Sequence, residues 1–222
     1  MSAVPSAAGS AAQGRGVAEA LARVRAGGLV AYPTETLWGL GADARSAAAL
    51  DRLRRWKRRS DQQPISILVE GFASLASLGV EADARVGALA AAFWPGPLTL
   101  VLACRSAFAP GVARADGAVG VRCSPHPVAA GLAAAVAEAA LGPLTATSLN
   151  RHGEPPARTR AEAELVCTED ADAPLVVGAG EAGGQPPSTV LDLTAGRPRV
   201  LRWGALDAAA LERVLGREER LA

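Results

Sequence analysis

Four short groups of polar residues interrupt apolar stretches of this chain, and their chemistry suits an anionic ligand. They are Thr34-Glu35-Thr36 after Pro33, the cations Lys57-Arg58-Arg59, Arg122 after an apolar run, and Thr147-Ser148-Leu149-Asn150. Hydroxyl, cationic and amide groups at the ends of buried strands destabilise a protein unless something polar binds there. Together the four groups predict a site for an anionic, hydroxyl-bearing substrate and a nucleotide.

The cations in this set have two interpretations each. Lys57 and Arg59 lie two residues apart beyond an expected helix, where they can reach different oxygens of one triphosphate. The alternative is a solvated run of surface charge. Arg122 directly follows the apolar residues Val119-Gly120-Val121, and an arginine in that place pairs with a carboxylate, either of the protein or of a ligand.

The neutral polar residues are equally ambiguous when taken alone. Ser148 and Asn150 can bind phosphate or ribose, or they can build a local Asx turn. Ser188 introduces an expected strand, where its hydroxyl can bind a ligand or merely the backbone. Arg202, at the end of a later strand, leaves the same two possibilities open.

Several other kinds of site are absent from the sequence. It contains neither a phosphate-binding loop ending in Gly-Lys-Ser/Thr nor a dinucleotide fingerprint after the first strand. Neither His126 nor His152 lies near a nucleophile motif, which argues against a Ser-His-Asp triad. No His, Cys or carboxylate cluster has metal-ligand spacing. What remains is positioning and charge neutralisation, which is the basis of phosphoryl and nucleotidyl transfer.

These polar groups require strands and helices to position them, and the sequence predicts both without strict alternation. We expect strands over 29–32, 64–69, 98–103, 118–122, 144–147, 175–177, 189–193 and 200–202. We expect helices over 17–26, 47–56, 82–93, 127–140 and 206–215, with Ser46 as an N-cap. This pattern indicates one α/β domain with a twisted, mixed β-sheet flanked by helices. The domain spans 17–215, and we expect residues 1–16 to form a disordered leader.

Bulk properties narrow the class of protein. The 222 residues suffice for one substantial domain, and the formal net charge of +1 gives no bulk support for wrapping nucleic acid. Three widely spaced cysteines indicate reduced thiols and hence a cytoplasmic location. Residues 1–16 have no apolar core like that of a signal peptide, and no stretch is long and apolar enough to span a membrane.

In combination and order, the motifs resemble the YrdC/TsaC family of L-threonylcarbamoyladenylate (threonylcarbamoyl-AMP) synthases. The resemblance covers roughly residues 17–210 and rests on Tyr32-Pro33-Thr34-Glu35-Thr36-Leu37-Trp38-Gly39-Leu40-Gly41, Lys57-Arg58-Arg59, Phe93-Trp94-Pro95-Gly96-Pro97-Leu98-Thr99, Val121-Arg122, Ser148-Leu149-Asn150, Ser188-Thr189-Val190-Leu191-Asp192 and Leu201-Arg202-Trp203-Gly204. The resemblance is specific because two long motifs, Pro33 to Gly41 and Phe93 to Thr99, occur in the family's order. It implies a single YrdC-like domain with a large, open, positively lined cavity.

The resemblance also implies a reaction. L-threonine and bicarbonate or CO2 form N-carboxy-threonine, whose carboxylate attacks the α-phosphate of ATP to give threonylcarbamoyl-AMP and pyrophosphate. Mg2+ is held mainly through the ATP phosphates. Separate threonylcarbamoyl-transferase proteins then modify the adenosine beside the tRNA anticodon, and direct contact of this chain with tRNA stays open.

By position, the resemblance assigns site residues to the two substrates. Thr34, Arg122 and Ser188 fall on the threonine side, with Arg122 binding the carboxylate. The nucleotide side comprises Lys57, Arg59, Ser148, Asn150, Arg158, Thr159 and Arg202. Lys57 and Arg59 are the expected catalytic residues, and no metal ligand is assigned.

Two departures from the family pattern concern the nucleotide side. Ser60 replaces a proline after the cationic cluster, and Leu149 replaces the alanine between Ser148 and Asn150, which predicts a narrower adenine pocket. These departures keep two alternatives open. One is a paralogue with the same fold and a different substrate; the other is an RNA-binding module without catalysis, against which the near-neutral charge and the lack of an aromatic stacking stripe count.

Overall fold

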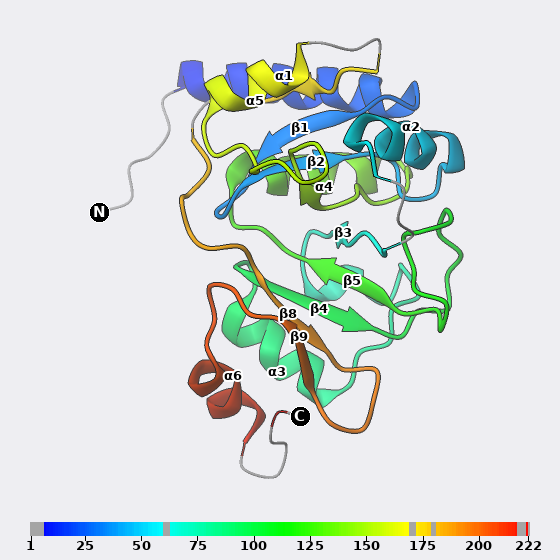
Figure 1. Cartoon of the computed structure of the whole chain (residues 1–222), viewed down its shortest axis with the longest axis vertical. Helices are drawn as coiled ribbons and strands as arrows, with labels where there is room; N and C mark the ends of the chain where they lie inside the picture. The colour runs from blue at the N-terminus through cyan, green and yellow to red at the C-terminus, as the bar shows by residue number, and fades with distance from the viewer. Residues whose placement is uncertain (1–6, 60–62, 169–171, 179–180, 217–220, 222) are drawn as a thin grey trace.

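The strands of the chain form two mixed sheets that lie one above the other (Figure 1). The structure is a computed structural model, and it describes residues 7–59, 63–168, 172–178, 181–216 and 221. The first sheet has the order β6-β2-β1-β7 and the second β3-β5-β4-β8-β9. The strands are β1 (Val30–Pro33), β2 (Trp38–Gly41), β3 (Ile67–Leu68), β4 (Leu98–Leu102), β5 (Val119–Arg122), β6 (Thr147–Ser148), β7 (Leu175–Val176), β8 (Thr189–Asp192) and β9 (Arg199–Arg202).

The two sheets meet through the segment before β6. The backbone N–H of Leu68 donates to the Leu144 carbonyl at 2.8 Å, and that of Ala146 donates to the Ser66 carbonyl at 2.6 Å. A single bridge pairs Ile67 with Thr145. The predicted mixed α/β class is confirmed, and the one sheet expected from the sequence is divided in two at this junction. The division opens a space between the sheets.

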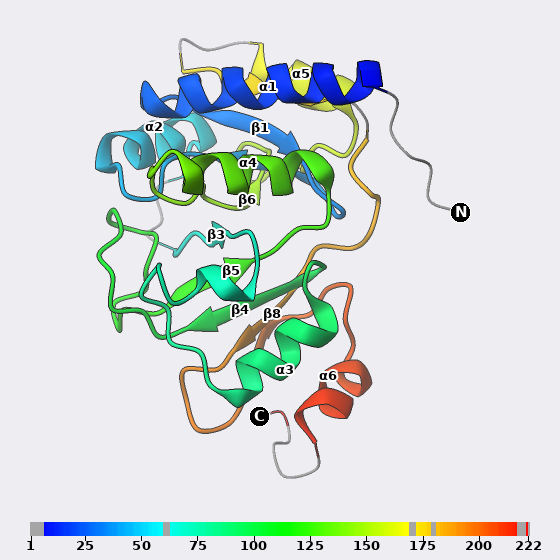
Figure 2. The same ribbon diagram turned by 180° about the vertical axis from the view of Figure 1, so that it is seen from behind.

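Helices cover the outer faces of both sheets (Figure 2). Helices α1 (Ala7–Arg25) and α4 (Pro127–Glu138) pack on the first sheet, where an apolar cluster includes Val24, Val30 and Leu132. Helices α3 (Ala84–Phe93) and α6 (Ala208–Leu215) pack together below the second sheet. Helices α2 (Ala47–Lys57) and α5 (Arg160–Cys167) and the 3-10 turn η1 (Phe72–Ser74) complete the described elements.

Local capping explains where α2 begins and ends. The hydroxyl of Ser46 accepts a hydrogen bond from the Ala49 N–H at 3.2 Å, as the sequence predicts. Arg58 ends the helix in the left-handed conformation, with φ at 52°. Leu50, Leu53 and Trp56 form the buried stripe of α2, so its last turn delivers Lys57 to the interior.

Two helix predictions need correction. Helix α1 begins at Ala7, not at residue 17; residues 1–6 of the expected leader lie outside the described residues. Helix α5 was not expected. Its signal is a capping box, in which the Thr159 hydroxyl accepts from the Glu162 N–H and the Glu162 carboxylate accepts from the Thr159 N–H.

Gly39 and Gly41 serve packing. Both lie in β2, and a Cβ atom at Gly39 would be 2.9 Å from the ring of Tyr32. The ring of Tyr32 lies across β2, and its hydroxyl donates to the Thr145 carbonyl at 2.9 Å. The two glycines therefore admit a large aromatic side chain beside the junction of the sheets.

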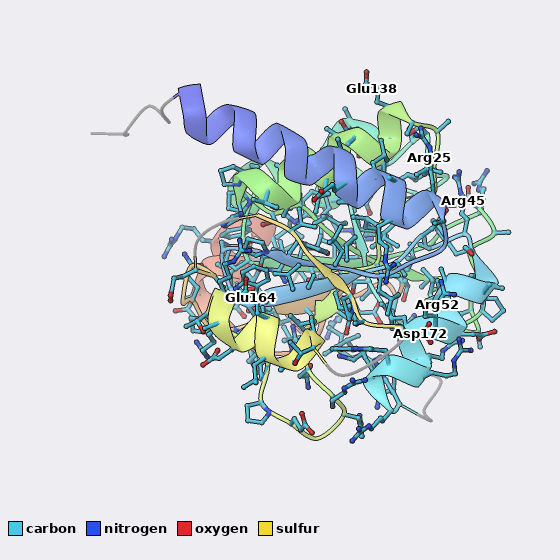
Figure 3. All side chains as sticks on the ribbon, turned by 90° about the horizontal axis from the view of Figure 1, so that it is seen from above. Arg25, Arg45, Arg52, Glu138, Glu164 and Asp172 are labelled. Carbon is cyan, nitrogen blue, oxygen red and sulfur yellow. The ribbon has the colours of Figure 1, made fainter. Side chains whose placement is uncertain are left out.

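Other interactions fix the edges of the fold. Arg52 of α2 and Asp172 before β7 form an ion pair with 2.7 Å between Nε and Oδ1, and they lie side by side in Figure 3.

The three cysteines carry free thiols. In the described part of the chain, each helix is too short or too polar to cross a membrane.

Candidate functional site

A cavity of about 480 Å³ is lined by residues from both sheets. Four arginines contribute to its wall, namely Arg59, Arg114, Arg122 and Arg202. Among the described residues that line it, none is aspartate or glutamate. Hydroxyl groups supply most of the remaining polar wall, from Thr34, Thr36, Ser66, Thr99, Thr147, Ser148 and Ser188. The cavity thus offers positive charge and hydrogen-bond donors, which suits an anionic ligand.

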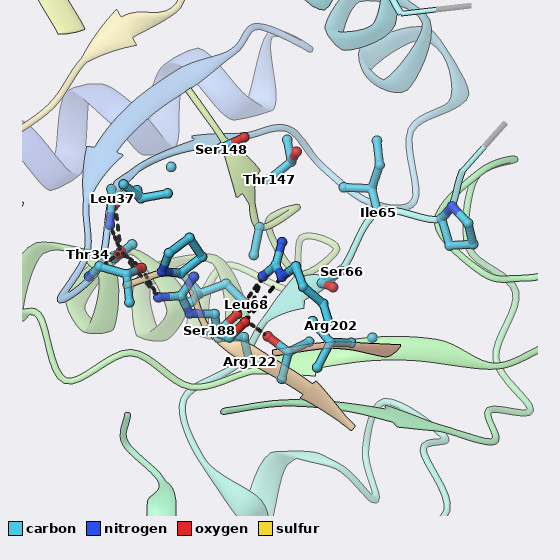
Figure 4. A pocket seen from close by; sticks show the side chains of 18 of the residues that line it. Thr34, Leu37, Ile65, Ser66, Leu68, Arg122, Thr147, Ser148, Ser188 and Arg202 are labelled. Atoms are coloured by element: carbon cyan, nitrogen blue, oxygen red, sulfur yellow. Dashed lines mark hydrogen bonds between the residues drawn. The ribbon is translucent and has the colours of Figure 1, made fainter. Parts of the chain in front are cut away.

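The loop between β1 and β2 forms one end of the cavity (Figure 4). Its conformation is fixed by Thr34, whose hydroxyl donates to the Leu37 carbonyl at 2.6 Å. The same oxygen accepts from the Thr36 N–H at 3.2 Å. Thr34 is buried, and it therefore shapes the loop while presenting its side chain to the cavity.

Arg122, the last residue of β5, connects the second sheet to this loop. Its Nη2 donates to Glu35 Oε1 at 2.8 Å, to Thr36 Oγ1 at 2.5 Å and to Thr34 Oγ1 at 3.3 Å. Its Nε is buried and has no hydrogen-bond partner among the described residues. A buried guanidinium N–H without an acceptor costs stability. Arg122 itself lines the cavity, but this atom is shielded from solvent.

Glu35 is the carboxylate that pairs with Arg122, and its part was missed in the sequence. Ser124 Oγ donates to Glu35 Oε2 at 2.5 Å, so both carboxylate oxygens are bonded. Of the two partners the sequence allowed for Arg122, the structure contains the protein carboxylate. The signal available in the sequence was that the carboxylate of Glu35 could supply the counter-charge that a strand-end arginine such as Arg122 needs.

Ser188 and Arg202 meet on the opposite side of Arg122 (Figure 4). Arg202 Nη2 donates to the Ser188 carbonyl at 2.9 Å and to Ser188 Oγ at 3.1 Å. Loss of solvent around the guanidinium, and then the positive charge of Arg122, lower the pKa of Arg202. Arg202 was assigned to the nucleotide, and the structure brings it together with the residues assigned to threonine. We call Thr34, Glu35, Arg122, Ser188 and Arg202 the arginine cluster.

Lys57 lies behind the cavity wall, where it holds a turn. Its ammonium donates to the Ser148 carbonyl at 2.6 Å, to the Asn150 carbonyl at 3.1 Å and to Asn150 Oδ1 at 3.2 Å. It is 4% exposed, and burial, followed by the charge of Arg59, lowers its pKa to about 8. We call Lys57, Ser148 and Asn150 the lysine cluster.

The lysine cluster is bonded mainly within itself. Asn150 Oδ1 accepts from the Ser148 hydroxyl at 2.6 Å, and Asn150 Nδ2 donates to the Glu154 carbonyl at 2.8 Å. The Asx turn that the sequence left open is not formed, because Asn150 Oδ1 accepts from the Ser148 hydroxyl and the Lys57 ammonium, and the His152 N–H donates to the Lys57 carbonyl. Of the cluster, Ser148 lines the cavity.

Leu149 does not narrow the cavity as the sequence suggested. Its side chain is completely buried in the main apolar core and is not among the lining residues. The backbone explains this, because Leu149 pairs with Trp38 and Ala157 through its N–H and carbonyl and turns its side chain away from the cavity. The second departure, Ser60, lies outside the described residues.

Of the other residues predicted to bind the nucleotide, one lines the cavity and two do not. Arg59 lines it, and its Nη2 donates to Gln63 Oε1 at 3.0 Å. Arg158 is exposed, and Thr159 uses its hydroxyl to cap α5; neither is among the lining residues. The structure therefore brings Arg59 and Ser148 to the cavity and leaves Arg158 and Thr159 apart from it.

Arg114 is a lining residue that the sequence did not single out. Its Nη1 donates to Asp192 Oδ2 at 2.6 Å and its Nε to Asp116 Oδ1 at 3.0 Å. These carboxylates raise the pKa of Arg114 further above its usual range, chiefly through their hydrogen bonds. Because both carboxylates already occupy its guanidinium, Arg114 stiffens the wall and is poorly placed to bind a ligand strongly.

The described residues contain no group of three or more His, Cys, Asp or Glu side chains that could hold a metal ion. His126 accepts the Val128 N–H at its Nδ1, at 3.2 Å, and so caps α4. A metal ion in this cavity would need its oxygen ligands from a bound substrate, since the arginine-rich wall supplies none with negative charge.

Known proteins are similar to this chain over most of its length. A sequence model of the Sua5/YciO/YrdC family, described as "Telomere recombination", matches residues 22–204. A Mycobacterium tuberculosis protein is 34% identical over 203 residues, which are 91% of this chain and 90% of the relative. A threonylcarbamoyl-AMP synthase of Chromohalobacter salexigens is 35% identical over 180 residues, with 81% and 94% covered.

A solved structure agrees. The crystal structure of P. abyssi Sua5 complexed with L-threonine superposes with a TM-score of 0.82 at 32% identity. The match covers 93% of this chain and 58% of that one. The family model alone spans well over half of the chain, so the protein belongs to the Sua5/YciO/YrdC family.

Proposed function

We propose that this protein is a threonylcarbamoyl-AMP synthase, an enzyme that transfers the adenylyl group of ATP to N-carboxy-threonine. A Chromohalobacter salexigens relative, 94% of which is matched by this chain, carries that name, and P. abyssi Sua5 has been solved with L-threonine. The proposal therefore names L-threonine, bicarbonate or CO2, and ATP as substrates. It makes the chain a nucleotidyltransferase.

The observation that carries the proposal is the place of Arg122 in a cavity wall that contains four arginines and, among the described residues, no acidic side chain. An amino-acid carboxylate would bring the negative charge that this wall lacks. Arg202 is close enough to Arg122 for their charges to interact, and both flank Ser188. Two cations and a hydroxyl around one point suit a carboxylate better than they suit a neutral ligand.

The nucleotide would lie against Arg59 and Ser148. Both residues line the cavity and offer a cation and a hydroxyl to phosphate and ribose oxygens. Lys57 would act on ATP by holding Ser148 and Asn150 in place. Mg2+ would enter with ATP, held by phosphate oxygens, because no acidic side chain faces the cavity from the described residues.

The chemistry needs no nucleophilic side chain. The threonine amine adds to CO2, or to bicarbonate with loss of water, and the new carboxylate attacks the α-phosphorus while pyrophosphate leaves. The work of the protein is to hold three substrates together and to neutralise their charge. Orientation of this kind can supply roughly 7–11 kcal/mol of the barrier.

The product is reactive, and its carbamoyl group would pass to the adenosine beside a tRNA anticodon. We assign that transfer to separate proteins, as the resemblance to the family implies. Direct contact of this chain with tRNA is therefore not required for the first reaction.

Product analysis tests the proposal. Purified protein with ATP, Mg2+ and bicarbonate should release pyrophosphate only when L-threonine is added, and mass spectrometry should detect threonylcarbamoyl-AMP. Binding of ATP without threonine-dependent pyrophosphate or adenylate would contradict the proposal and would favour a paralogue with another substrate.

A further inference from the structure

Thr99 lies between Arg122 and Ser188, two of the residues that the proposed function places around the threonine carboxylate. In the register of the second sheet, Thr99 of β4 pairs with Arg122 of β5 on one side and with Val190 of β8 on the other. Its Oγ1 is 2.9 Å from Ser188 Oγ. Thr99 and Ser188 are 3% and 2% exposed, and both line the cavity.

The hydroxyl of Ser188 has one proton to donate and two lone pairs to accept with. Arg202 Nη2 lies 3.1 Å from this oxygen, and a guanidinium can only donate, so one lone pair of Ser188 is occupied. Either hydroxyl can donate in the contact between Thr99 and Ser188. The direction of that one bond decides which proton faces the cavity.

A bound anion makes one direction better than the other. If Thr99 donates, its proton is satisfied and both lone pairs of Ser188 are filled. The Ser188 proton is then free for the ligand, and it is strengthened by the cation that donates to the same oxygen. If Ser188 donates to Thr99, the arginine no longer polarises the proton that meets the ligand.

We infer that Thr99 is a positioning residue, which donates to Ser188 Oγ and thereby aims the Ser188 proton at a carboxylate oxygen of the amino-acid substrate. This role rests on the proposed function, because it takes the ligand to be threonine. This inference adds Thr99, which lies behind Ser188, to the residues that determine threonine binding. It also gives a function to the threonine in the Pro97-Leu98-Thr99 motif.

Titration calorimetry of L-threonine with the full-length protein tests the inference. Thr99→Val keeps the shape of the side chain and removes its hydroxyl. It should weaken threonine binding about 5- to 20-fold, because Ser188, the donor to the ligand carboxylate, loses the hydrogen bond that orients it. Thr99→Ser restores the hydroxyl and should bind within about twofold of wild type. ATP affinity should stay unchanged in both variants.

The double variant separates a positioning role from a structural one. Because Thr99 acts through Ser188, adding Thr99→Val to Ser188→Ala should weaken binding by less than about twofold beyond Ser188→Ala alone. Thr145→Val is the matched control: it also removes a buried hydroxyl, one that accepts from the Ala42 N–H at 3.0 Å outside the cavity wall. It should lower the melting temperature and leave threonine affinity unchanged.

The outcomes are distinguishable. Wild-type protein that fails to bind threonine would overturn the proposed function and this inference with it. Wild-type binding that Thr99→Val leaves unaltered, or independent effects of Thr99→Val and Ser188→Ala, would overturn the inference alone. Equal weakening by Thr145→Val would show that loss of a buried hydroxyl anywhere has the same effect, which also contradicts a specific role for Thr99.

Discussion

The arginine cluster and the lysine cluster are both cationic, yet they use their donors differently. The arginine cluster joins the β1–β2 loop to the second sheet, and Arg122 Nε has no acceptor among the described residues. The lysine cluster closes on itself, and Lys57 has an acceptor for each of its three protons. Arg122 and Arg202 of the first cluster line the cavity, where an anion can reach them, whereas Lys57 of the second cluster stabilises a turn. In one site, some cationic residues can therefore bind the ligand while others stabilise the wall of the cavity.

Arg122→Ala should have the largest effect. It removes the proposed carboxylate partner and should weaken threonine binding by about 2–5 kcal/mol, with little change for ATP. It also leaves Glu35, 8% exposed, without its counter-charge, which costs about 3–5 kcal/mol of unfolding free energy. Calorimetry and urea unfolding measure the two effects.

The double variant Arg122→Ala/Glu35→Gln is the control for this change. Removing the carboxylate charge should recover part of the lost stability, because no buried charge is left unpaired. It should not recover threonine affinity. Recovery of both would show that Arg122 matters for folding and that it does not bind the ligand.

Leu149→Ala should act almost entirely on stability. The side chain is fully buried in the core, so its truncation should lower the unfolding free energy by about 2–5 kcal/mol. Urea unfolding and ATP titration check this. A large gain in ATP affinity with little loss of stability would place Leu149 in the nucleotide pocket after all.

Lys57→Ala and Arg59→Ala test the lysine cluster against its cationic neighbour. Lys57→Ala leaves the Ser148 and Asn150 carbonyls without a donor and should cost about 1–3 kcal/mol of stability. Arg59→Ala should change stability by less than about 0.5 kcal/mol. Both should weaken ATP use more than threonine binding. Equal loss of stability in the two variants would contradict the division between wall and ligand residues.

The smallest expected effect is a pH dependence of the lysine cluster. Burial lowers the pKa of Lys57 to about 8 from its usual 10.5, so between these values the unfolded chain holds more protons than the folded one. The contribution of Lys57 to the unfolding free energy should therefore rise with pH above 8, on the order of 1 kcal/mol by pH 9.5. Urea unfolding at pH 7.5 and 9.5 measures this rise.

Lys57→Met is the comparison for that measurement. It has no titrating amine at this position and should show a smaller rise than the wild type over the same interval. An identical pH dependence in the two proteins would assign the rise to other groups.

The sequence predicts most of the strands and helices because apolar runs, caps and glycine stops are local signals. It does not predict the division into two sheets, because the Leu68–Leu144 pairing depends on contacts between residues far apart in the chain. Helix α5 was missed although its Thr159–Glu162 capping box is visible in the sequence, because the following residues have little apolar pattern.

The site was predicted in composition but not in arrangement. Thr34, Arg122 and Ser188 all line the cavity, and Thr34 is hydrogen-bonded to Arg122; their binding of threonine stays a prediction. The pairing of Arg202 with Ser188 and the burial of Lys57 depend on side-chain directions that residue types do not specify. Glu35 and Thr99 act through other side chains, so their places required a structure.

A crossed titration tests most directly whether Arg122 and Arg59 serve different substrates. Threonine and ATP would each be titrated into wild type, Arg122→Ala and Arg59→Ala. Arg122→Ala should lose threonine binding and retain ATP binding, and Arg59→Ala should show the reverse. Equal losses for both ligands in both variants would show that Arg122 and Arg59 do not divide the substrates between them.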